Sequence, residues 1–264
     1  MKIIFHILKI VLLTIITQIG GVIYLISIIG IKSNVTKYRF KRSILFATLY
    51  LATTFLIIPQ ISSYFGREKI KESKYLVAHS VWYKILNRNY VTPKLNKVLT
   101  DISDKFNNKH NGIKIIYLDA NFPFFDNFPL LPHLSHHDGK KIDLTFIYKT
   151  EDTKLTNKKP SRSGYGVYEN PFKNEYNQIN ICKNKGYWQY DFPKYLTLGK
   201  MHKQLTFSEK ATRNLLLISA NQKNISKIFI EPHLKQRLNL TNKKIRYHGC
   251  QAVRHDDHIH IQVK

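Results

Sequence analysis

Cysteine and acidic residues are scarce in this chain. There are two cysteines in 264 residues and no Cys-x-x-Cys pair, which excludes a zinc-ribbon type of metal site. Cys182 and Cys250 form one disulfide if the domain lies outside the cytoplasm, or they remain two buried thiols, and both alternatives stay open. Acidic residues number 17 against 42 lysines and arginines, so the formal net charge is +25.

This surplus of positive charge indicates the kind of partner. A strongly cationic surface attracts polyanions, such as nucleic acid, anionic lipid headgroups or acidic cell-wall polymers. Many lysines neighbour asparagine, isoleucine or tyrosine, which the codon bias of an AT-rich genome also produces, so the charge alone does not choose a function. Acid is scarcest at the N-terminus, where residues 1–69 contain nine lysines and arginines and a single acid, Glu68.

Two long stretches without charge lie in the same region. Ile10–Ile31 has 22 such residues and Ser43–Ser63 has 21. A helix needs about 20 residues to cross the hydrocarbon layer of a membrane, so we predict two transmembrane helices within an anchor of residues 1–66. A cleaved signal peptide is the competing interpretation of the first stretch, but the apolar core is too long for one and no small-x-small cleavage site follows it.

The segment between the two stretches predicts the orientation. Lys32–Arg42 holds five cations and no acid in eleven residues, and short loops of this kind stay in the cytoplasm. This places both ends of the hairpin, and the rest of the chain, on the periplasmic or extracellular side. Four cations at positions 67–74, directly after the second stretch, argue in the opposite direction.

The remaining chain is predicted to contain a connector over residues 67–93 and an α+β domain over residues 94–264. We expect a small antiparallel sheet with flanking helices that holds a zinc site. Helices are predicted at 94–108, from Ser208 onward and at 232–238, and strands at 113–118, 142–148, 227–230 and 258–263. Residues 149–178 are polar and rich in Gly and Pro, which predicts a long excursion from the sheet.

Histidines gather in two short windows. His258 and His260 lie two apart on the last predicted strand, so they point to the same face, either as part of a metal site or as an exposed titrating pair. In the other window His136 precedes Asp143, and Gly139 between them permits a sharp turn. Two histidines and one carboxylate form the ligand set of several catalytic zinc sites, which leave a fourth position for water.

The motifs in these windows resemble those of the penicillin-insensitive murein endopeptidases and, more broadly, of the lysostaphin / D-Ala-D-Ala metallopeptidase group. The first motif is His-x-Ser-His at 133–136 followed by Asp143, and the second is His-Asp-Asp-His-Ile-His at 255–260. The segment 227–238 also resembles the one that precedes the last motif in that group. The resemblance extends, in patches, from about residue 113 to the end of the chain.

This resemblance implies roles for individual residues. It implies that zinc is bound by His136, Asp143 and His260, that His133 lies close to the metal as a possible further ligand, and that His258 and His255 are catalytic residues without a bond to the metal. The sequence also departs from the family. Residues 253–254 are Val-Arg where Trp-Gly is common, and the Glu-x-x-Trp-His motif of the dipeptidase branch is absent, so no glutamate base can be carried over.

The expected function is that of a zinc endopeptidase. The resemblance implies hydrolysis of peptide cross-links in peptidoglycan at the extracytoplasmic face, with the membrane as a partner and no nucleic acid. His258 would take the proton of water or stabilise the oxyanion, while Asp256 and Asp257 either orient the imidazoles or form a solvated acidic turn. The alternatives are a D-Ala carboxypeptidase and a membrane-tethered, non-catalytic module that binds an anionic polymer.

Overall fold

The computed structural model describes residues 2–264, which form two compact units. The first unit comprises Met1–Ile70, Val81–Pro93 and Ala120–Gly139, and the second comprises Lys71–Ser80, Lys94–Asp119 and Lys140–Lys264. Each unit is therefore built from segments that are far apart in the sequence. The linear division into anchor, connector and domain remains a prediction.

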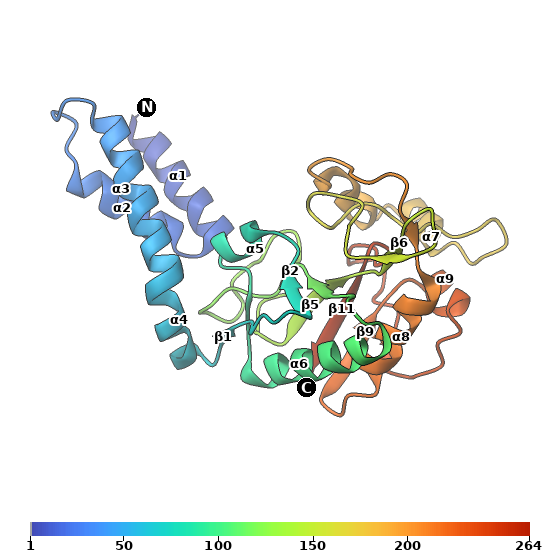
Figure 1. Cartoon of the computed structure of the whole chain (residues 1–264). Coiled ribbons are helices and arrows are strands. Elements are labelled where there is room, and N and C mark those ends of the chain that lie inside the picture. The colour runs from blue at the N-terminus through green and yellow to red at the C-terminus, as the bar shows by residue number, and fades with distance from the viewer. Residues whose placement is uncertain (1) are drawn as a thin grey trace. The chain divides into compact units, whose positions relative to one another are not determined.

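One long apolar helix dominates the first unit. It starts as α3 (Tyr38–Ala52), continues through a π-helical turn (Thr53–Ile57) and α4 (Ile58–Ile61), and ends in a 3-10 turn (Ser62–Phe65). Together these form a continuous helix of 28 residues, which contains an 18-residue stretch with a mean hydropathy of 1.9 (Figure 1). It includes the whole of the second predicted span. Among the described residues it is the one helix long and apolar enough to cross a membrane.

The first predicted span, Ile10–Ile31, is not a single helix. It is divided between α1 (Lys2–Thr17) and α2 (Gly20–Gly30), with Gln18 at a positive φ of 68° between them. At about 1.5 Å per residue, helices of 16 and 11 residues extend roughly 24 and 17 Å, less than the hydrocarbon thickness of about 30 Å. The structure thus has one candidate membrane helix where the sequence predicted two.

Two glycines explain this break. A Cβ atom on Gly21 would lie 2.0 Å from Oγ1 of Thr14 and 2.5 Å from the carbonyl oxygen of Ile10, so α2 begins in close backbone contact with α1. Glycine is the residue that permits such an approach. The prediction of one long helix was wrong because the residues of this turn are uncharged and so do not interrupt the apolar stretch.

The helices are tied to later segments of the same unit. The side-chain oxygen of Gln18 accepts a hydrogen bond from the backbone N–H of Phe124 (3.1 Å), and the hydroxyl of Tyr50 donates to the carbonyl of Ile85 (2.7 Å). Ile85 ends the short helix α5 (Val81–Ile85). A two-stranded ladder of β1 (Glu68–Lys69) and β3 (Tyr90–Val91) completes the connection. These bonds fix the α1–α2 turn against the segments that follow the long helix.

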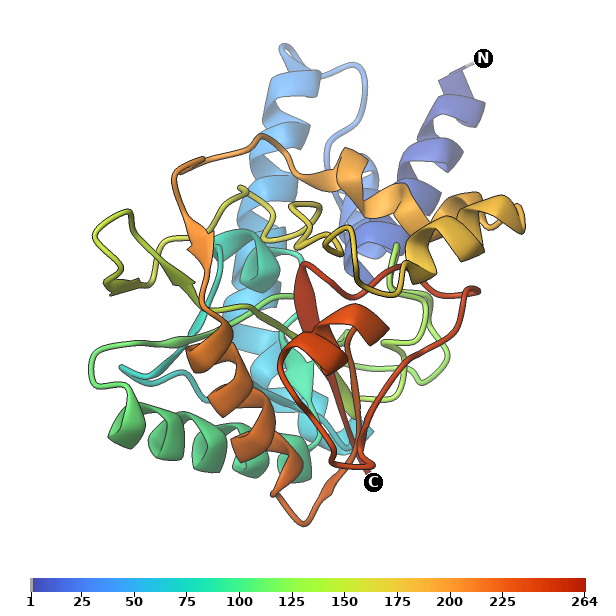
Figure 2. The same ribbon diagram turned by 90° about the vertical axis from the view of Figure 1, so that its right-hand side faces the viewer.

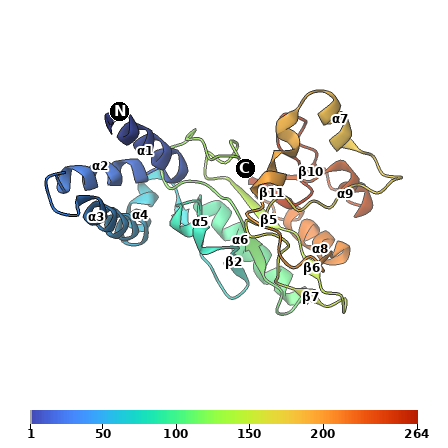
Figure 3. The ribbon, with the colours of Figure 1, turned by 90° about the horizontal axis from the view of Figure 1, so that it is seen from above.

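A six-stranded sheet forms the centre of the second unit, in the order β10-β9-β11-β5-β4-β2. Figures 2 and 3 show the ribbon from two further sides. The strands are β2 (Leu76–Ala78), β4 (Ile115–Tyr117), β5 (Lys141–Thr145), β9 (Ile225–Phe229), β10 (Ile245–Arg246) and β11 (His258–Val263). The four inner strands are antiparallel, whereas β2 and β10 pair with their neighbours in parallel. The predicted α+β class is confirmed, with parallel strands added at the two edges.

Two amphipathic helices belong to this unit. Helix α6 (Pro93–Lys109) buries Leu95, Leu99, Ile102 and Phe106, which recur at helical spacing. Helix α8 (Glu209–Ala220) lies beside it, and Nδ2 of Asn214 donates to Nε2 of His110 directly after α6 (2.9 Å). Both helices were predicted from the sequence.

The excursion after β5 forms a second, smaller structure. Strands β6 (Tyr148–Lys149), β7 (Leu155–Thr156) and β8 (Thr206–Phe207) form a three-stranded sheet in the order β7-β6-β8. In the chain, α7 (Gln178–Asn184) and a 3-10 helix at Trp188–Leu196 lie between β7 and β8. Cys182 of α7 forms a disulfide with Cys250, with a Cα–Cα distance of 5.3 Å. Of the two alternatives left open by the sequence, the structure has the disulfide.

Candidate metal centre

The site is built on the pairing of β5 with β11. His260 lies opposite Asp143, His258 lies opposite Thr145, and Ile259 lies opposite Leu144. Because side chains alternate along a strand, Asp143, His258 and His260 share one face of the sheet. Ile259 and Leu144 share the other face and are fully buried, so the apolar packing on that side fixes the register of the polar side.

The carboxylate of Asp143 is the centre of the polar face. Its Oδ1 lies 2.9 Å from Nδ1 of His260, and its Oδ2 lies 3.7 Å from Nε2 of His258. The hydroxyl of Tyr165 donates to Oδ2 at 2.9 Å. Asp143 is 1% exposed, His258 0% and His260 2%. A buried carboxylate is retained only with strong partners, and here two imidazoles and a phenol supply them.

A second carboxylate orients His258. Oδ1 of Asp257 lies 2.5 Å from Nδ1 of His258, and Oδ2 of Asp257 accepts from the backbone N–H of Gly166 (2.6 Å). This bond places the proton of His258 on Nδ1 and turns Nε2 toward Asp143. Asp256 and Asp257 are 0% and 1% exposed, so the interpretation of this pair as a solvated acidic turn is wrong. Asp257 is an orienting carboxylate, the other of the two alternatives.

Asp256 forms an ion pair with Arg254. Arg254 bonds it through both Nε (2.6 Å) and Nη2, and Nη1 of Arg254 bonds Oδ1 of Asp191 (3.1 Å). The guanidinium also lies 3.8 Å over the ring of Tyr168. Arg254 is one of the two residues, 253–254, at which the sequence departs from the motif pattern that it otherwise resembles. It links the loop before β11 to the excursion after β5.

His255 packs against the two strand histidines. Its ring centroid lies 4.8 Å from that of His258 and 5.7 Å from that of His260. Burial lowers the pKa of His255 well below its usual value, and the neighbouring imidazoles lower it further. The backbone of His255 is held by Glu231, whose Oε1 accepts from its N–H (2.9 Å). His255 is therefore a neutral imidazole beside the ladder at neutral pH.

The first histidine window belongs to the first unit. Nδ1 of His136 donates to the carbonyl of Ala120 (2.7 Å), which makes Nε2 the nitrogen with the lone pair. Gly139 has the expected positive φ (75°), and its N–H donates to Oδ1 of Asn121 (3.0 Å). The ring of His133 lies 5.5 Å from that of His136, and the two residues are 6% and 1% exposed. Both histidines are thus buried side chains on an ordered loop.

Buried histidine and aspartate side chains of this chain could hold a metal ion. His133 and His136 lie in the first unit, and Asp143, His258 and His260 lie in the second. These five residues include every metal ligand predicted from the sequence. Two imidazoles with one carboxylate suit zinc, and the same set also suits iron(II).

Sequence reasoning did not find every member of the site. Tyr165 was not among the predicted site residues, yet its hydroxyl donates to Asp143, and its ring lies 5.1 Å from that of His258. Glu231 received no role, although it is 1% exposed and accepts from both the backbone of His255 and the hydroxyl of Tyr190. No local pattern identifies either residue, because their partners are 22 to 41 positions away in the sequence.

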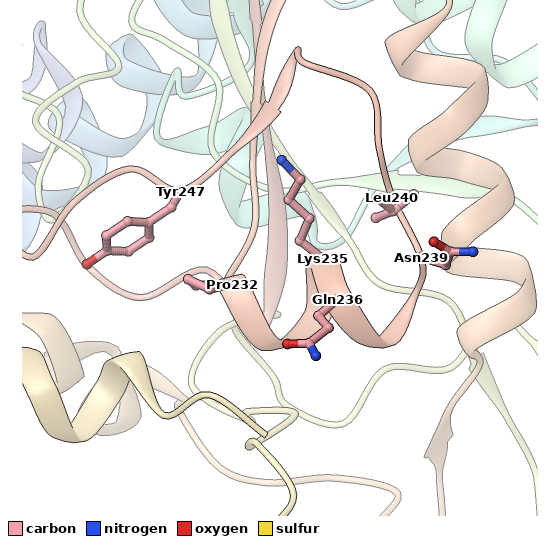
Figure 4. Close-up of a pocket in the computed structure, with 6 residues that line it drawn as sticks. All are labelled: Pro232, Lys235, Gln236, Asn239, Leu240 and Tyr247. Atoms are coloured by element: carbon pink, nitrogen blue, oxygen red, sulfur yellow. The ribbon is translucent and has the colours of Figure 1, made fainter. Parts of the chain in front are cut away.

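A separate pocket lies beside α9 (Pro232–Arg237), between this helix, the turn that follows it and Tyr247 (Figure 4). The described residues that line it are Pro232, Lys235, Gln236, Asn239, Leu240 and Tyr247. The ammonium group of Lys235 donates to the carbonyl of Ile245 (2.7 Å) and so helps to hold β10. This lining includes no histidine or carboxylate, so it offers neither metal ligands nor an acid–base pair.

No protein-family model matches the chain, and a search of curated proteins also found no match. The similarity to the murein endopeptidases therefore remains a prediction carried by the two motifs.

Proposed function

We propose that this chain is a membrane-anchored, zinc-dependent peptidase that hydrolyses the peptide part of peptidoglycan. The observation that carries the proposal is the buried Asp143 carboxylate, with Nδ1 of His260 at 2.9 Å and His258 on the same face of the ladder. A buried, hydrogen-bonded carboxylate among imidazoles is costly for stability and fits a metal centre better than a packing role.

Zinc would be held by His136, Asp143 and His260, with His133 as a possible further ligand. This set is preferred because Asp143 lies closer to His260 than to His258, and because the Ala120 carbonyl leaves Nε2 of His136 as the coordinating nitrogen. When bound, zinc supplies a Lewis acid that polarises an amide carbonyl and lowers the pKa of water toward about 7.

The other residues of the cluster would orient the metal ligands or accept a proton. His258 is placed to accept a proton at Nε2, since Asp257 holds the proton on Nδ1. Tyr165 fixes one oxygen of Asp143 and so sets the direction of the carboxylate. His255 packs beside His258 as a neutral ring and adds no positive charge to the cluster.

The anchor would place this chemistry outside the cytoplasm. In this proposal the helix Tyr38–Phe65 crosses the membrane, the shorter α1 and α2 dip into it as a pair, and the cationic loop at 32–42 stays inside. The Cys182–Cys250 disulfide fits an oxidising compartment. A cationic protein facing the wall is also suited to an anionic polymer.

The test is cleavage of purified cross-linked muropeptides by the full chain in detergent. We expect cleavage that a chelator abolishes, that zinc restores, and that His260→Ala removes, while His202→Asn outside the cluster retains it. Product analysis separates the cross-link endopeptidase from a D-Ala carboxypeptidase, which releases free alanine. Binding of muropeptides without any turnover, unaffected by chelator and by His260→Ala, would instead establish the non-catalytic binding module.

A further inference from the structure

A second site lies in the N-terminal helices of the first unit. Helices α1, α2 and α3 line a cavity of about 640 Å³. Its walls combine aromatic and aliphatic side chains with three cations, Lys9, Arg39 and Arg42. None of the described residues lining it is acidic, and residues 1–67 contain no aspartate or glutamate at all. The cations of this cavity therefore have no carboxylate from their own segment.

Aromatic rings and backbone carbonyls hold these cations in place. The ammonium group of Lys9 lies 4.5 Å from the ring centroid of Phe5 and 5.7 Å from that of Tyr24. Arg42 donates through Nε to the carbonyl of Ile31 at the end of α2 (2.6 Å), and its guanidinium lies 5.0 Å over the ring of Tyr38. The three cations repel one another, so binding of an anion in this cavity is electrostatically favourable.

The apolar surroundings indicate which anion. Phe5 and Leu12 line the cavity and are 57% and 55% exposed, so an aliphatic chain can lie along α1 while a charged group reaches the cations. The N–H groups of Arg39 and Arg42 suit the oxygens of a phosphate. Basic pockets between membrane helices on the cytoplasmic side bind anionic headgroups. We infer that this cavity binds one anionic phospholipid, with its phosphate at Lys9, Arg39 and Arg42 and an acyl chain along α1.

This inference rests on the membrane location in the proposed function, but not on the metal chemistry. In that topology the cavity belongs to the same end of the helices as the loop at 32–42, where cytoplasmic-leaflet lipids are negatively charged. A bound lipid would cover apolar side chains of α1 and place one negative charge among the three cations, which reduces their mutual repulsion. It would thereby hold the short α1–α2 pair against α3.

The experiment uses the full chain reconstituted in nanodiscs with equal amounts of phosphatidylglycerol and phosphatidylcholine. Native mass spectrometry of the released protein counts the lipids that stay bound. We expect a preference for phosphatidylglycerol that falls on the order of a hundredfold in Lys9→Gln/Arg39→Gln/Arg42→Gln, as three near-surface cations are removed. The control Lys32→Gln/Lys37→Gln/Lys41→Gln removes the same charge from the neighbouring loop and should keep most of the preference.

Three results overturn the inference. Equal losses in both triple variants would mean that the charge attracts lipid only diffusely. Complete displacement of the lipid by excess inorganic phosphate would mean that the site recognises a free anion. Recovery of the wild-type chain without any membrane association would remove the proposed location itself, a failure distinct from a membrane-bound chain with no lipid preference.

Discussion

In α2 and in the long helix Tyr38–Phe65 large apolar side chains lie on the surface, whereas in strands β5 and β11 ionisable side chains lie in the interior. Ile29 and Leu56 are 70% and 68% exposed, while Asp143 and His258 are 1% and 0% exposed. Either arrangement is unfavourable for a protein that needs only to fold in water. This difference supports the two proposals made above, that the first region faces lipid and that the second holds a metal ion.

The largest expected effect comes from removing the carboxylate of Asp143. Asp143→Asn should weaken zinc binding by more than about a hundredfold, because even outer-shell partners of a metal contribute 10–100-fold. A competition titration with a chromophoric chelator measures this change. The control Asp152→Asn alters an exposed aspartate in the β6–β7 turn and should leave the affinity unchanged. Similar affinities for both variants would make the buried ladder a structural feature.

The apolar surface is tested by placing a charge on it. Leu56→Lys should disfavour membrane insertion by about 3 kcal/mol, the cost of a lysine near the centre of a spanning helix. Tyr64→Lys, near the end of the same helix, should cost much less because its ammonium group reaches water. Alkaline extraction of membranes measures the inserted fraction. If Leu56→Lys stays as firmly inserted as the wild type, this helix does not face lipid.

Lys159 offers a buried charge with no metal-binding role. It is 4% exposed, donates to the carbonyl of Phe146 (2.9 Å), and burial lowers its pKa to about 7. The folded state then binds fewer protons than the unfolded state between pH 7 and about 10.5, so stability rises with pH across that window. The penalty is complete below pH 7 and vanishes above about 10.5.

Lys159→Met removes this penalty. It should raise the free energy of unfolding by roughly 2 kcal/mol at pH 6, after the loss of one hydrogen bond, and by less as the pH approaches 10. Urea unfolding of the full chain in micelles at the two pH values measures the difference. A gain that is independent of pH would show that Lys159 is charged and solvated.

The smallest effect is expected at the orienting carboxylate. Asp257→Asn keeps the size of the side chain but weakens the hold on Nδ1 of His258, which should lower kcat/KM on the order of tenfold. Zinc content should stay the same if His258 is a catalytic residue, and should fall if His258 is a ligand. Asp104→Asn on the exposed face of α6 serves as the matched control.

Much of the fold and the main candidates of the site could be predicted from the sequence because they depend on local patterns. The alternation at 258–263 placed both histidines on one face, and the apolar spacing of 94–108 predicted α6. The break at Gln18 escaped prediction, since two glycines and a turn cause it within an uninterrupted apolar run. Tyr165 and Glu231 were missed because only the tertiary fold brings them to the ladder.

The most direct test of the metal centre is the metal content of the full chain, purified without a metal-binding tag and measured by inductively coupled plasma mass spectrometry. The account predicts about one zinc per chain in the wild type, and its loss in Asp143→Asn but not in Asp152→Asn. Equal, substoichiometric metal in all three proteins would contradict it.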